Sequence, residues 1–147
     1  MYPSTLISLF AASLASGMAL TPEVLGRAGP STPPVIDTCW NTGENWGADS
    51  GLAKNYAAQA CNDAFVGTSG SRTWEAGDEI EKCYNLDSTK MVDFTIENTS
   101  GAAATLTSDE CYTYLTKQIH GCGQGGYQKN SGFLFKSDPN SGQCATN

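Results

Sequence analysis

The sequence predicts an α+β domain: a split β-α-β-β-α-β sandwich with two helices packed on an antiparallel sheet, cross-linked by disulfides. Three observations predict it. Along residues 38–147, stretches with apolar residues at helical spacing are followed by stretches in which apolar and polar residues alternate as in a strand. Six cysteines fall inside this range and none before it. A range of this length buries one modest core and not two, so a single domain is expected.

Residues 1–19 are typical of a signal peptide. The first 20 residues carry no Lys, Arg, Asp or Glu, and residues 6–14 form an apolar run. That run is shorter than the roughly 20 residues that a membrane span needs. Gly17 and Ala19 fit the −3 and −1 positions of a cleavage site, so we expect cleavage after Ala19 and secretion of the protein.

Residues 20–37 are predicted to form a flexible tail, because this stretch holds four of the six prolines and no hydrophobic period. The net charge of the chain is −7, without a basic cluster. An acidic domain of this kind is not expected to bind nucleic acid or anionic membranes, and no second apolar span suggests membrane insertion.

The first half of the domain is expected to contain a short strand and a helix. The strand covers residues 38–40. Asp49 is a candidate N-cap for a helix over residues 50–63, which places Leu52, Tyr56 and Ala60 along one side.

The middle of the domain is predicted to form a hairpin. Residues 92–96 alternate apolar and polar side chains, which indicates a half-buried strand. Residues 80–86 are its expected partner, joined by a turn at residues 87–89.

The second helix has a clear start. Thr107 and Glu110 form a capping box, Cys111, Leu115 and Ile119 follow at helical spacing, and Gly121 or Gly123 ends the helix. A strand at residues 133–135 and a turn at residues 138–142 complete the predicted order.

The even number of cysteines predicts three disulfides, and the sequence leaves all 15 pairings open. A zinc site would need closer spacing than the eleven residues that separate the nearest pair, so no metal is expected. The six cysteines are Cys39, Cys61, Cys83, Cys111, Cys122 and Cys144.

Catalytic motifs are missing from the sequence, and no catalytic residue or cofactor is assigned. The single histidine, His120, lies where a helix end favours a cation. The carboxylate pairs Asp78 with Glu81 and Asp109 with Glu110 are explained by a solvated surface and a helix start. A small extracellular ribonuclease that uses His120 remains one alternative.

Aromatic residues among amides and glycines favour a site for glycans. Sugars stack their C–H faces on aromatic rings and pair their hydroxyls with amide and carboxylate side chains. We expect Trp46 and Tyr127 to be exposed and Trp40 to lie in the core, and leave Trp74 open between the two. The candidate glycan-binding residues are Asn45, Trp46, Trp74 and Tyr127.

Asn98-Thr99-Ser100 is a glycosylation sequon at the expected end of a strand, so Asn98 is a candidate glycosylated residue on a surface turn.

Several short motifs, spread over residues 38–144, carry a family resemblance. They are Cys39-Trp40, Gly43-x-x-Trp46-Gly47, Ala60-Cys61, Lys82-Cys83, Asp109-Glu110-Cys111, Cys122-x-x-Gly125-Gly126 and Asp138-Pro139-Asn140-x-Gly142-x-Cys144. In these the chain resembles the small secreted glycan-binding proteins of mushrooms, which have an αβα-sandwich fold. The resemblance implies a non-catalytic lectin for N-acetylated or fucosylated glycans. More distantly, the second half is similar to fungal killer toxins and necrosis effectors, which gives a cytotoxic protein as another alternative.

Overall fold

The computed structural model describes residues 38–145, so the expected signal peptide and tail lie outside the described residues. Within this range the predicted α+β sandwich is confirmed. The elements are β1 (Thr38–Cys39), α1 (Ser50–Ala60), β2 (Ser71–Trp74), β3 (Glu79–Asn85), β4 (Lys90–Asn98), β5 (Ala104–Thr107), α2 (Ser108–Gly121), β6 (Gly126–Asn130) and β7 (Phe133–Ser141).

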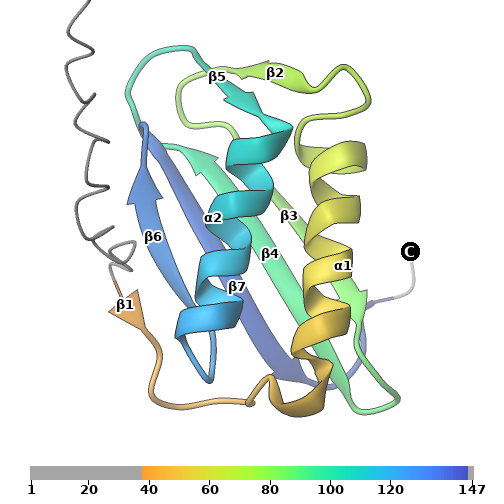
Figure 1. Ribbon diagram of the computed structural model, residues 1–147. Helices are drawn as coiled ribbons and strands as arrows, with labels where there is room; N and C mark the ends of the chain where they lie inside the picture. The colour runs from red at the N-terminus through yellow and green to blue at the C-terminus, as the bar shows by residue number, and fades with distance from the viewer. Residues whose placement is uncertain (1–37, 146–147) are drawn as a thin grey trace, which may run out of the picture. The chain divides into compact units, whose positions relative to one another are not determined.

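Five strands form one sheet in the order β1-β6-β7-β4-β3, and every neighbouring pair is antiparallel. Both helices lie side by side across one face of this sheet (Figure 1). We call this the helix face and the opposite side the open face. β2 and β5 pair separately as a short ribbon near the start of α2 (Figure 1). Neither helix of the described range is long and apolar enough to cross a membrane.

The core lies between the helices and the helix face. Because side chains alternate along a strand, every second residue of β4 and β7 is buried there. The small side chains of α1 let its backbone approach the sheet closely. The core residues include Val92, Phe94 and Ile96 of β4, Phe133 and Phe135 of β7, Ala53, Ala57 and Ala60 of α1, and Cys111, Leu115 and Ile119 of α2.

The predicted start of α2 is confirmed. The Glu110 amide donates to Thr107 Oγ1 at 3.2 Å, and the Thr107 amide donates to Glu110 Oε2 at 3.1 Å. The predicted hairpin is also present, since β3 pairs with β4 along its whole length. Asp87 Oδ1 closes its turn by accepting the Thr89 amide at 2.6 Å.

The expected cap of α1 is wrong. Asp49 makes no capping hydrogen bond. Its carboxylate instead forms a salt bridge with Lys90, with 2.8 Å between Nζ and Oδ2. A short 3-10 turn, Gly47–Asp49, leads into the helix. Beyond Ala60 the chain continues as one π-helical turn, Cys61–Phe65, so the helical run ends in a different geometry from the one predicted.

The turn expected at residues 138–142 is also wrong, because β7 runs on to Ser141 beside β4. Proline is disfavoured inside a sheet but tolerated at edges. β6 pairs no further than Ser137, so Pro139 lies where β7 has a single neighbour. The chain turns only at Gly142, whose φ is +109°. The strands β2, β5 and β6 were not predicted, since they are short and polar.

The three expected disulfides are present, and no cysteine is free. Cys39–Cys122 joins β1 to the residue after α2, Cys61–Cys111 joins the two helices, and Cys83–Cys144 joins β3 to the chain beyond β7. These links tie both edges of the sheet and the helix layer together.

Candidate functional site

Trp46 does not serve as a surface platform. Only 3% of the residue is exposed, so the expectation of an exposed ring is wrong. Its indole Nε1 donates to the Cys122 carbonyl at 2.8 Å, and its backbone amide donates to the Gly123 carbonyl at 3.0 Å. Trp46 therefore anchors the loop before α1 to the end of α2.

Trp74 is buried completely, which settles the question that the sequence left open. Its ring meets Phe133 edge-on at 6.0 Å between centroids, and the Arg72 guanidinium lies 5.3 Å from the ring centroid. Trp40, expected in the core, is only half-buried and lies outside it. Because β1 is a two-residue edge strand, little structure covers its end.

The four candidate binding residues do not form one surface. Trp46 contacts the end of α2, whereas Trp74 lies in the ribbon whose other strand, β5, leads into the start of α2. A helix of 14 residues is about 21 Å long. Tyr127 is half-buried on the open face, opposite Lys136 of β7, and Asn45 is exposed in the loop before α1. Only the last two are available to a ligand.

Asn98 is not on a surface turn, and this expectation is wrong. The residue is 1% exposed. Its amide nitrogen lies within 3.0 Å of the carbonyl oxygens of Trp74, Glu75 and Ala102, and its carbonyl oxygen accepts the Ser100 amide. A glycan on that nitrogen would displace these contacts, so we expect Asn98 to stay unglycosylated in the folded domain.

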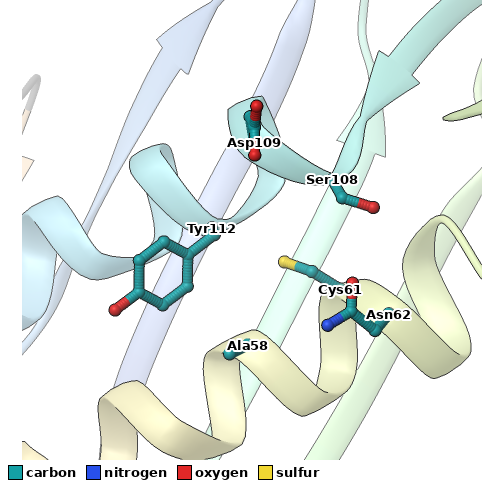
Figure 2. Close-up of a pocket in the computed structure, with 6 residues that line it drawn as sticks. All are labelled: Ala58, Cys61, Asn62, Ser108, Asp109 and Tyr112. Atoms are coloured by element: carbon teal, nitrogen blue, oxygen red, sulfur yellow. The ribbon is translucent and has the colours of Figure 1, made fainter. Parts of the chain in front are cut away.

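A hollow between the two helices offers a better site. It has a volume of about 190 Å³ and lies where the end of α1 meets the start of α2. Figure 2 shows the Tyr112 ring and the Asn62 side chain on its two sides and the Cys61 sulfur between the helices. Its lining residues are Ala58, Cys61, Asn62, Ser108, Asp109 and Tyr112.

Local structure explains why these side chains meet. The Cys61–Cys111 disulfide holds α1 and α2 together at this level, with 5.8 Å between the two Cα atoms. Tyr112 follows Cys111 in α2 and therefore points beside the buried stripe, with 40% of the residue exposed. On the other wall, the π-helical turn that begins at Cys61 presents Asn62 to solvent.

The polar groups of this hollow are not engaged by the protein. Within residues 38–145 no hydrogen bond or ion pair involves the Asn62 amide or the Asp109 carboxylate. Ser108 Oγ is buried and likewise has no partner in this range. An exposed ring beside an amide, a carboxylate and a hydroxyl is the set of groups that a sugar needs: a face for its C–H groups and partners for its hydroxyls.

The open face carries a second polar feature. Asp93 of β4 and Asp138 of β7 are direct cross-strand partners, and the Asn140 amide donates to Asp93 Oδ2 at 3.0 Å. Burial raises the pKa of the Asp93 carboxyl. Burial also raises the pKa of the Asp138 carboxyl, and repulsion from Asp93 adds to it. The pair is an electrostatic cost to the fold at neutral pH.

Groups for metal or acid–base chemistry are scarce. No cluster of three or more His, Cys, Asp or Glu side chains within residues 38–145 is placed to hold a metal ion. His120 lies exposed in the last turn of α2, at the helix end where it was expected.

Comparison with known proteins gives the family. Residues 52–144 match the model of the glycan binding domain Y3. The chain belongs to this family. It is also 33% identical over 90 residues to the antiviral protein CAP from Coprinus comatus, a match that covers 58% of this chain and 88% of that protein.

These findings confirm the resemblance to mushroom glycan-binding proteins and make this Y3-family domain a carbohydrate-binding protein. They do not favour a killer toxin or a ribonuclease. The matched region contains every residue that lines the hollow, whereas Asn45 and Trp46 precede it.

Three residues that line the hollow of the Y3-family domain, Asn62, Asp109 and Tyr112, are not among the binding residues that the sequence predicts. Asp109 was explained as part of a helix start, which it is, but its carboxylate is not used there. Tyr112 had a signal: its place beside the helical stripe of Cys111 and Leu115 predicts a ring at the boundary of the core. That Asn62 lies opposite follows only from the Cys61–Cys111 pairing, which the sequence does not give.

Proposed function

We propose that the Y3-family domain binds an N-acetylated sugar residue of a glycan in the hollow between α1 and α2. The observation that carries this proposal is the exposed ring of Tyr112 beside unpaired polar side chains in a concave site. The specificity for N-acetylated sugars follows from the chemistry of the residues that line the hollow.

The walls suit a pyranose ring. Tyr112 supplies a flat apolar surface of low conformational entropy, against which the C–H face of a sugar packs. The Asn62 amide both donates and accepts hydrogen bonds, and the Asp109 carboxylate accepts two or more. Because these groups have no partner within residues 38–145, a sugar hydroxyl replaces water there and breaks no protein contact.

The apolar lining suits an acetamido group. The Cys61 sulfur lies between the two helices, and the Ala58 methyl on α1 is the other apolar group that lines the hollow. An acetyl methyl packed on them leaves its amide N–H to donate to a carboxylate, and Asp109 is the one at this site. The methyl group of a fucose residue fits the same apolar lining but lacks that donor, so N-acetylation is the favoured feature.

We propose also that the protein is secreted. Three disulfides in a domain of this size are typical of an oxidising compartment, and they support the extracellular role that residues 1–19 suggested.

The test is a titration of the purified protein with N-acetylglucosamine, glucose and L-fucose by calorimetry or NMR. We expect Tyr112→Ala to weaken binding of N-acetylglucosamine about tenfold or more, and Tyr112→Phe to retain most of it. Glucose, which lacks the acetamido group, should bind more weakly. Tyr127→Ala is the matched control, because this ring lies on the open face.

Two results would contradict the proposal: unchanged affinity of Tyr112→Ala, or a loss of affinity in Tyr127→Ala alone. The second would move the site to the open face. Tyr112 is exposed, so the thermal midpoint of Tyr112→Ala should stay within a few degrees of the parent, which separates lost binding from lost folding.

A further inference from the structure

A second hollow lies on the other flank of the first turns of α2. Its volume is about 150 Å³, and it is lined by Asp109, Glu110, Thr113 and Tyr114. Asp109 lines both hollows. The two sites are therefore adjacent and share one carboxylate.

Helical geometry sets how the two hollows are arranged. Successive residues of an α-helix are about 100° apart, so Tyr112 and Tyr114 project from opposite flanks of α2. Asp109 and Thr113, at spacing i and i+4, are neighbours on the exposed strip between these flanks. Both are exposed. A ligand that leaves the first hollow meets this strip before it reaches the second.

The second hollow differs in chemistry from the first. The Tyr114 ring is occupied by protein: Lys117 Nζ lies 4.3 Å from its centroid, and the Phe135 ring lies 5.0 Å away. Glu110 Oε2 accepts the hydrogen bonds of the capping box. What remains is polar, namely the Thr113 and Tyr114 hydroxyls and the Asp109 carboxylate, none of which is engaged within the described range.

We propose that the second hollow is a subsite for the adjoining sugar of the same glycan, so that the domain recognises at least two linked sugar residues. The inference rests on the proposed function, which places the first sugar against Tyr112. The first residue is held by stacking and its acetamido group, and the second by hydrogen bonds from its hydroxyls. Asp109, between the two, accepts from both.

The experiment compares N-acetylglucosamine with its β1,4-linked dimer. We expect the dimer to bind the parent protein about tenfold more tightly, the effect of about one added hydrogen bond to a charged group. Thr113→Tyr fills the second hollow from an exposed position and should reduce the affinity for the dimer to that for the monosaccharide. The monosaccharide itself should bind this variant as it binds the parent.

His120→Tyr is the matched control, since it adds a similar ring to an exposed residue of α2 about 10 Å further along the helix. It should leave both affinities unchanged. Equal affinities of monosaccharide and dimer for the parent, or a dimer advantage that survives in Thr113→Tyr, would overturn the second subsite while the proposed function stands. If neither sugar binds the parent, or if Tyr112→Ala binds both as the parent does, the proposed function fails and the subsite fails with it.

Discussion

Replacing Trp46 tests the burial of this residue directly. Truncating a buried tryptophan to alanine costs about 3–5 kcal/mol through the cavity it leaves, and here the Cys122 carbonyl also loses the indole N–H that donates to it at 2.8 Å. We expect Trp46→Ala to lower the free energy of unfolding by about 4 kcal/mol. In a domain of roughly 100 residues this corresponds to a fall in the thermal midpoint of about 15–20 °C. Trp46→Phe keeps one ring and loses the hydrogen bond, so about half of that cost is expected.

The assay is thermal and urea unfolding of both variants beside Tyr112→Ala, followed by circular dichroism. Sugar binding is then measured at a temperature where each protein is folded, and it should match the parent. A thermal midpoint of Trp46→Ala within about 5 °C of the parent would refute the burial of Trp46, because removal of a buried ring that anchors a loop should destabilise the fold more than this. Weakened sugar binding in the fully folded variant would restore Trp46 as a ligand contact.

Two further predictions concern polar groups. Folded-state pKa values of Asp93 and Asp138 above the ordinary carboxyl value mean that the folded state binds protons more tightly, so their contribution to stability is lost as pH rises through the raised pKa values. Asp138→Asn should therefore be more stable than the parent at pH 7 by ~0.5 kcal/mol. Urea titrations should show this difference shrinking as the pH falls towards 4. Plots of the free energy of unfolding against pH that stay parallel for the two proteins would contradict this. When the domain is expressed in a glycosylating host, mass spectrometry should find no glycan at Asn98, and a glycan there would contradict the burial of its amide. Asn98→Asp replaces a buried hydrogen-bond donor with a carboxylate, so it should lower the free energy of unfolding by roughly 3 kcal/mol.

Local signals in the sequence were enough to predict much of this fold. The capping box of Thr107 and Glu110 and the alternation at residues 92–96 each depend on neighbours in the chain, and both elements are present. Elements that depend on distant partners were not predictable in the same way. β6 is a strand because β7 lies beside it, and Asp49 pairs with a lysine 41 residues away.

The candidate site was also predictable only in part, because its residues come from distant parts of the sequence. Composition predicted aromatic and amide groups for sugar binding, yet the residues that meet in the hollow come from two helices joined by a disulfide whose pairing was open. Trp46 was misjudged because its neighbours in the sequence are polar and its neighbours in space are not. The motif Gly125-Gly126 is explained by packing: a Cβ on either residue would come within 2.3 Å of a backbone oxygen of a neighbouring strand. These two glycines therefore determine the local backbone and give no information about the ligand.

The Cys61–Cys111 link also determines how a ligand meets the domain. Cys61 lines the hollow, and its disulfide to Cys111 holds the two helices that form the walls at one separation before any sugar arrives. A site of this kind has no closure step, so little conformational entropy is lost on binding and nothing must reopen for release. Sugars should therefore exchange rapidly, and lasting attachment to a cell or particle would come from many weak contacts on a surface crowded with the same glycan.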